Sequence, residues 1–136
     1  MDRSARPMDG AKIRSALSMM NERGSGEGAG YAVYGAFPEF ADYYAIHVFF
    51  DAVHESKTAV DLELEKWGTV VHEEEVPTYE NSRIRRVHTP WRYFFRPDPS
   101  LMPRSMTPED DIVMHLAMKI NTTIPAALVY ASGKNV

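Results

Sequence analysis

The chain has 136 residues, of which 44% are hydrophobic and 25% charged, and its formal net charge is −4 at pH 7. These values are typical of a single globular domain that is long enough to bury a core. The acidic balance argues against a nucleic-acid partner, and no apolar run approaches the roughly 18 residues that a membrane span needs. The sequence contains no cysteine, which excludes disulfides and thiolate metal sites, and its N-terminal segment lacks a hydrophobic signal peptide. The expected location is therefore the cytoplasm, with no membrane association.

The first segment, residues 10–22, is predicted to form an amphipathic helix that Asp9 caps at its start. Apolar residues recur in it at positions i, i+4 and i+7, namely Ile13, Leu17 and Met20. Gly24 is predicted to end the helix in the left-handed conformation. A short strand is expected over residues 31–34, and Pro38 interrupts it.

From residue 42 onward the pattern alternates between strands and helices. Residues 42–51 are expected to form a strand with Tyr44, Ile46, Val48 and Phe50 on one face. Helices are expected over residues 55–67 and from residue 107 to residue 123, and further strands over residues 69–76, 91–96 and 124–131. The resulting β-α-β-β-α-β order is that of a ferredoxin-like split βαβ unit, so the expected fold class is α+β.

Four glycines separate the first predicted helix from the first predicted strand: Gly24, Gly26, Gly28 and Gly30. They follow a helix and precede a strand, whereas phosphate-binding glycine loops precede a helix whose N-terminal amides face the anion. Their spacing alone therefore indicates a structural corner at which backbones approach closely.

Six stretches of the chain resemble class II glutamine amidotransferases: residues 18–24, 28–35, 37–51, 91–94, 109–111 and 131–135. The last four of these stretches resemble, more specifically, proteins related to the amidotransferase part of archaeal-type glutamate synthase. It implies that Arg23, Gly24, Gly28 and Gly30 form a helix-to-strand corner of an Ntn-hydrolase-type αββα framework. Residues 1–40 would belong to that framework, and residues 41–136 would be a βαββαβ ferredoxin-like unit attached to it or inserted in it.

The resemblance also implies a reaction, in which complete family members hydrolyse glutamine to glutamate and deliver ammonia to a synthase. Their nucleophile is the thiol of an N-terminal cysteine, and its own free α-amine is the base. This chain begins with Met1 and Asp2, and the family's glutamine-binding segments would lie beyond Val136. The chain is therefore expected to be truncated at both ends and inactive alone, with no catalytic residue and no cofactor. A synthase or a complementary amidotransferase subunit would be its partner.

The histidines and the charged runs are weaker candidates for a site. His47, Asp51 and His54 have loose metal-ligand spacing, but no H-E-x-x-H motif accompanies them, so structural histidines and no metal are expected. The glutamates at 73–75 would divide between the two faces of a strand, which indicates a solvated edge strand. An anion or an acidic partner could be bound by a basic run, whose favoured interpretation is a solvated loop: Arg83, Arg85 and Arg86.

Two classes of function remain open on the sequence. The first is membership of the class II glutamine amidotransferases. The second is a non-catalytic ferredoxin-like interaction or regulatory module, which would dimerise through its sheet or dock onto a partner that holds the active site. The coding sequence around the reading frame would discriminate them, because an upstream Met-Cys-Gly run and a downstream continuation would favour a truncated enzyme.

Overall fold

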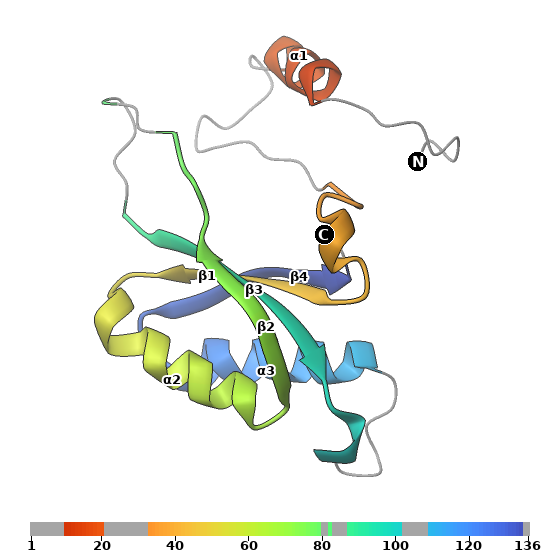
Figure 1. Ribbon diagram of the computed structural model, residues 1–136. Coiled ribbons are helices and arrows are strands. Elements are labelled where there is room, and N and C mark those ends of the chain that lie inside the picture. The colour runs from red at the N-terminus through yellow and green to blue at the C-terminus, as the bar shows by residue number, and fades with distance from the viewer. Residues whose placement is uncertain (1–9, 21–32, 80–81, 83–86, 102–108, 135–136) are drawn as a thin grey trace. The chain divides into compact units, whose positions relative to one another are not determined.

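The computed structural model describes residues 10–20, 33–79, 82, 87–101 and 109–134 (Figure 1). Its elements are α1 (Ala11–Met19), η2 (Pro38–Phe40), β1 (Tyr44–Phe50), α2 (Val53–Glu65), β2 (Gly68–Glu75), β3 (Thr89–Pro97), η3 (Pro99–Leu101), α3 (Glu109–Thr123) and β4 (Ala127–Lys134). The chain divides into two compact units, residues 1–32 and residues 33–136. Helix α1 is the described element of the first unit, and the sheet belongs to the second.

Helix α1 is shorter than predicted, because it ends at Met19, where the amide of Met20 donates to the carbonyl of Leu17. Ile13 and Leu17 are half-buried, whereas Met20, the third residue of the predicted apolar stripe, is 53% exposed. The predicted cap and the predicted helix-to-strand corner lie outside the described residues: Asp9, Arg23, Gly24, Gly28 and Gly30.

The strand expected over residues 31–34 is wrong for its described part, since Val33 and Tyr34 are not in a strand. The physical reason is the turn that follows. Gly35 has a φ of 75°, and Pro38 begins the single turn η2. A positive φ is accessible to glycine without the steric cost that other residues meet, so the chain bends here and does not extend.

The second unit is α+β, and its elements follow the predicted β-α-β-β-α-β order. Its four strands form one sheet in the order β2-β3-β1-β4, and every neighbouring pair is antiparallel. Strand β3 therefore lies between β1 and β2, the strands that α2 connects. Helices α2 and α3 lie along the same face of the sheet (Figure 1).

The core lies between that face and the two helices. The residues predicted to share one face of β1 do share it, and the structure shows that this face points into the core, because Tyr44, Ile46, Val48 and Phe50 are all buried. The helices supply the opposite side of the core with residues at helical spacing, namely Val60, Leu64, Ile112, Leu116 and Ile120. Full burial of each such side chain contributes about 1.5–3 kcal/mol.

Strand β2 begins at Gly68, which the sequence predicts only as the end of the preceding helix. A Cβ atom at this position would lie 2.1 Å from the carbonyl oxygen of Arg96 and 2.7 Å from the ring of Phe95. Only glycine lets β2 approach β3 so closely. A register irregularity follows between Val70 and His72, and β2 is an edge strand, as predicted.

Strand β4 begins at Ala127, three residues later than predicted. The side chain of Asn121 explains the shift, since its Nδ2 donates to the carbonyl of Val129 at 3.0 Å and its Oδ1 accepts from the amide of Val129 at 2.6 Å. Ala126 then turns the chain with a φ of 61°. None of the helices in the described part of the chain is long and apolar enough to cross a membrane.

Candidate functional site

The residues of the hypothetical metal site are not brought together. His47 lies on β1 beside Tyr130, with 5.8 Å between ring centroids, while His54 lies exposed in the first turn of α2. Asp51 hydrogen-bonds to His88. Within the described ranges, no three histidine, aspartate or glutamate side chains gather into a group that could hold a metal ion.

The acidic run of β2 divides between the two faces of the sheet, as predicted. Glu73 faces α2 and pairs with Lys57 at 2.7 Å, whereas Glu74 faces the other way and accepts from Nε of Arg92 at 3.1 Å. Glutamates of the predicted solvated strand therefore also form ion pairs with neighbouring elements. The basic run at residues 83, 85 and 86 lies outside the described residues.

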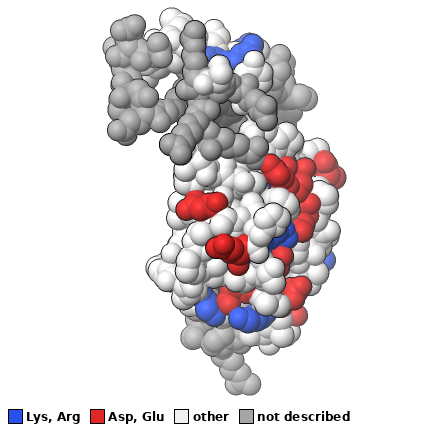
Figure 2. Space-filling view, turned by 90° about the vertical axis from the view of Figure 1, so that its left-hand side faces the viewer, with Lys and Arg blue, Asp and Glu red and all other residues white. Residues whose placement is uncertain are grey.

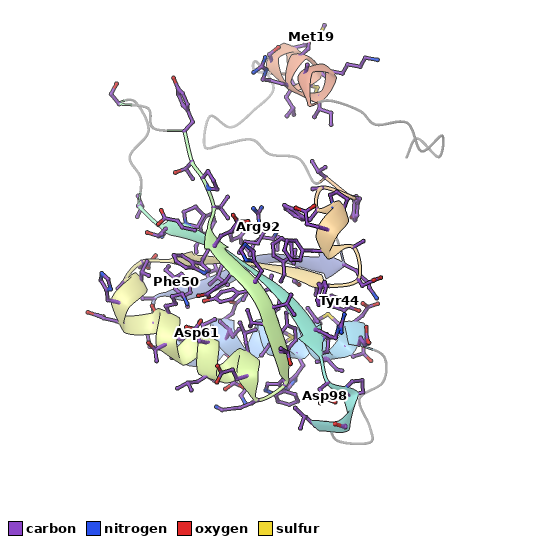
Figure 3. All side chains as sticks on the ribbon, in the orientation of Figure 1. Met19, Tyr44, Phe50, Asp61, Arg92 and Asp98 are labelled. Carbon is purple, nitrogen blue, oxygen red and sulfur yellow. The ribbon has the colours of Figure 1, made fainter. Side chains whose placement is uncertain are left out.

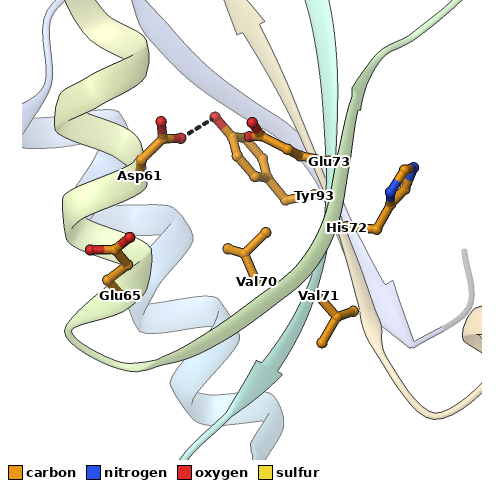
Figure 4. Close-up of a pocket in the computed structure, with 7 residues that line it drawn as sticks. All are labelled: Asp61, Glu65, Val70, Val71, His72, Glu73 and Tyr93. Atoms are coloured by element: carbon orange, nitrogen blue, oxygen red, sulfur yellow. Dashed lines mark hydrogen bonds between the residues drawn. The ribbon is translucent and has the colours of Figure 1, made fainter.

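A pocket of about 300 Å³ lies between α2 and β2 (Figure 4). Its lining residues are Asp61, Glu65, Val70, Val71, His72, Glu73 and Tyr93. The hydroxyl of Tyr93 donates to Oδ1 of Asp61 at 2.8 Å, and Nζ of Lys57 donates to Oδ2 of Asp61 at 2.8 Å.

Two groups at this pocket, Tyr93 and Lys57, are held in their protonated forms. Burial, and then the hydrogen bond to Asp61, raise the pKa of Tyr93, so its hydroxyl stays protonated. Burial lowers the pKa of Lys57, but its bonds to Asp61 and Glu73 outweigh that effect and raise it. These groups hold α2 against the sheet, and neither is activated for proton transfer at neutral pH.

Carboxylates are not confined to this pocket, since Figure 2 shows Asp and Glu side chains spread over one face of the molecule with Lys and Arg interspersed.

The face of the sheet that lies opposite the helices carries aromatic side chains in two groups. The first, here called the covered part, is Phe37, Phe40 and Phe94. The rings of Phe40 and Phe94 stack with centroids 3.9 Å apart, and Phe37 meets Phe94 edge-on at 5.0 Å. Arg92, labelled in Figure 3, places its guanidinium 4.2 Å from the ring centroid of Phe37. Phe94 is consequently only 1% exposed.

The second group, here called the uncovered part, is Phe49, Leu128 and Tyr130. Phe49 and Tyr130 also stack at 3.9 Å, but Leu128 is 51% exposed and Tyr130 is 43% exposed. Burial raises the pKa of Tyr130, and the nearby Arg92 opposes that shift. These three side chains are apolar or neutral, in contrast to the acidic surface around α2 and β2.

Sequence reasoning placed no site on this face. It interpreted residues 37–40 as a break after a strand and as part of a resemblance, although Phe37 and Phe40 flank a proline at a spacing of three. A second signal was the uninterrupted run Tyr93, Phe94 and Phe95. Consecutive large apolar residues in a strand indicate burial on both of its faces.

A second pocket, of about 170 Å³, lies where β1 ends and where β3 and β4 begin. Its lining residues are Phe49, Asp51, His88, Ala126, Ala127 and Leu128. It adjoins the uncovered part, with which it shares Phe49 and Leu128.

Comparison with known proteins gives one relative. No family model matches the chain, and no solved structure matches it. An uncharacterized protein of Archaeoglobus fulgidus is 39% identical over 136 residues, an alignment that covers 99% of this chain. The chain spans 36% of the length of that relative.

Proposed function

We propose that the second unit is a ferredoxin-like interaction module that associates with a second copy of itself through the uncovered part of its sheet. The observation that supports this most directly is the exposure of Leu128 and Tyr130 on one edge strand, beside the half-buried ring of Phe49. Adjacent exposed apolar side chains are a frequent mark of a protein-binding surface.

The charge distribution favours this surface for self-association. A second copy carries the same net charge of −4, so contacts between acidic regions such as β2 are repelled. The edge strand β2 carries three consecutive glutamates, whereas β4 has no carboxylate and one charged residue, Lys134. An isologous dimer needs a surface that is complementary to itself, and neutral aromatic and aliphatic side chains satisfy that requirement.

The experiment measures the mass of the chain in solution by analytical ultracentrifugation over a range of concentrations. We expect the unmodified chain to dimerise, and Leu128→Glu or Tyr130→Glu to weaken the dimer by at least about tenfold, because each buries a charge in the interface. Leu62→Glu is the matched control, since Leu62 is 54% exposed on α2 and should leave the dimer unchanged. A monomer at every concentration, or an equal effect of Leu62→Glu, would contradict the proposal.

A second candidate function is supported by the sequence resemblance. In it, the chain is part of a protein related to the class II glutamine amidotransferases, and the ferredoxin-like unit is attached to or inserted in an Ntn-hydrolase-type framework. The relative from Archaeoglobus fulgidus extends beyond the aligned region, which leaves room for such a framework in that protein. The family reaction is hydrolysis of glutamine and transfer of ammonia to a synthase.

This chain does not itself contain the nucleophile of that reaction, because it has no cysteine. The purified polypeptide should therefore release no glutamate from glutamine above the buffer rate. If it is mixed with a subunit that carries an N-terminal cysteine, any turnover should depend on that cysteine. Thiol-independent turnover by this chain alone would contradict the assignment.

A further inference from the structure

The pocket at the end of the sheet contains a histidine whose two ring nitrogens have different surroundings. Asp51 follows β1 and His88 precedes β3, and Nδ1 of His88 hydrogen-bonds to Oδ1 of Asp51. When this carboxylate is ionised, Nδ1 carries the proton that is donated to it. In the neutral imidazole, the free lone pair is then on Nε2, and this nitrogen can accept a proton.

The ring of His88 is also held by its neighbours. Its centroid lies 5.5 Å from that of Phe49, at an interplanar angle of 37°. The side chains of His88 and Asp51 are 46% and 58% exposed, so water and small solutes reach both of them. Phe49 and Leu128 give the pocket an apolar wall beside these polar groups.

The backbone of the pocket is strained at one position. Ala126 is a non-glycine residue with a positive φ, of 61°, and in this left-handed conformation its Cβ approaches the following carbonyl oxygen closely. Its carbonyl accepts from the amide of Asp51 at 2.9 Å and from Oγ of Ser56 at 3.3 Å. The strained residue therefore helps to fix Asp51, and strain of this kind is frequent at functional sites.

We propose that this pocket is a hydrolytic site for esters of small uncharged acyl groups, in which His88 is the general base and Asp51 positions it. The pocket shares Phe49 and Leu128 with the uncovered part, so this activity belongs to the monomeric chain, and self-association through that surface would reduce it. The described lining residues include no serine, threonine or cysteine, so the nucleophile is water. The apolar part of the acyl group would contact Phe49 and Leu128.

The reaction balances without a cofactor. Nε2 of His88 takes a proton from water while the water oxygen forms a bond to the ester carbonyl carbon. The tetrahedral intermediate collapses, the bond between carbonyl carbon and ester oxygen breaks, and the alcohol leaves with the electron pair of that bond. The imidazolium returns its proton to the leaving oxygen or to solvent. Ionised Asp51 stabilises the imidazolium in the meantime.

The experiment measures release of nitrophenolate from p-nitrophenyl acetate by the full chain between pH 5 and pH 9, at a concentration at which ultracentrifugation gives a monomer. We expect a rate that saturates with substrate concentration and that His88→Gln reduces by about tenfold or more. His54→Gln is the matched control, because His54 is an exposed histidine that does not line the pocket, and its rate should equal that of the unmodified chain.

Asp51→Asn tests the positioning role through the split between kcat and KM. It removes the charge that stabilises the imidazolium, whereas the apolar wall of the pocket stays in place, so kcat should fall and KM should stay near that of the unmodified chain. A rate that does not saturate, an unchanged rate in His88→Gln, or an equal fall in His54→Gln would overturn the proposal. An unchanged kcat in Asp51→Asn would overturn the role of Asp51.

Discussion

The two faces of the sheet are built by the same strands and use aromatic side chains differently. On the face that α2 and α3 cover, Phe50 and Tyr93 are fully buried in a continuous core. On the opposite face, η2 covers Phe94, whereas Leu128 and Tyr130 remain exposed. Because β1 and β3 carry large apolar residues toward both faces, the helices and the short turn η2 decide which of these residues are removed from water.

The largest expected effect is a difference in stability between alanine variants of two adjacent residues of β1. Phe50→Ala should lower the free energy of unfolding by about 3–5 kcal/mol, because it leaves a cavity in the core under the helices. Phe49→Ala, on the opposite face, should cost only about 1 kcal/mol, since its ring is half-buried and keeps solvent contact. Urea denaturation of both variants measures the difference, and equal losses would show that the two faces are equivalent in energy.

Acid should lower the free energy of unfolding, because it protonates Glu63 on the helix-covered side of the sheet. Burial would raise the pKa of this carboxyl, but hydrogen bonds from Lys119, Lys66 and Trp67 outweigh it and lower the pKa to about 2. A lowered folded-state pKa stabilises the protein above the ordinary value near 4.5 and loses that contribution as pH falls toward 2. At 1.36 kcal/mol for each pKa unit, the contribution is on the order of 3 kcal/mol.

The measurement is the free energy of unfolding of the unmodified chain and of Glu63→Gln between pH 6 and pH 2. Glu63→Gln should be less stable at pH 6 and should lose less stability as the pH falls. Glu65→Gln, an exposed position on the same helix, is the control and should follow the unmodified chain. Parallel curves for Glu63→Gln and the unmodified chain would show that Glu63 is not the source of the acid sensitivity.

Gly68→Ala tests how closely β2 and β3 approach. The new Cβ would lie 2.1 Å from the carbonyl oxygen of Arg96, and that backbone atom cannot move away without disturbing the strand pairing. We expect a loss of about 1–3 kcal/mol, which is typical of overpacking. Gly35→Ala is an informative comparison, because no atom lies within 4 Å of its Cβ position and only its positive φ opposes the change. A Gly68→Ala variant as stable as the unmodified chain would mean that the edge strand shifts freely.

The smallest effect concerns the covered part of the open face. Phe40→Ala should lower stability by about 1–2 kcal/mol, because it removes the ring that stacks on Phe94 and on His72. Phe40→Leu should avoid much of that loss, since leucine keeps apolar area over Phe94. Thermal unfolding measures both variants. A change of less than the experimental error in Phe40→Ala would mean that η2 does not contribute to the stability of this face.

The candidate sites were less predictable than the fold. Asp51 and His88 are 37 residues apart, and only the pairing of β1 with β3 brings their side chains together. The same sequence suggested Asp51 with His54 through their short separation, whereas α2 begins between them and His54 lies exposed in its first turn. A short separation in sequence predicts which side chains lie close together within one helix or strand, but not when the two residues belong to different elements.

The sequence by itself determined the β-α-β-β-α-β order, the residues that share each face of β1 and the apolar stripes of α2 and α3, because a period of two or of 3.6 is a local property of the chain. It also determined the absence of a thiol nucleophile. Only the tertiary structure decided that Phe40 stacks on Phe94, that Gly68 must lack a side chain, that Glu63 holds Lys66 and Lys119, and that Asp51 meets His88. Most of these contacts join elements that are distant in the chain, and the pairing of strands and the packing of helices select them from many partners that local patterns allow equally.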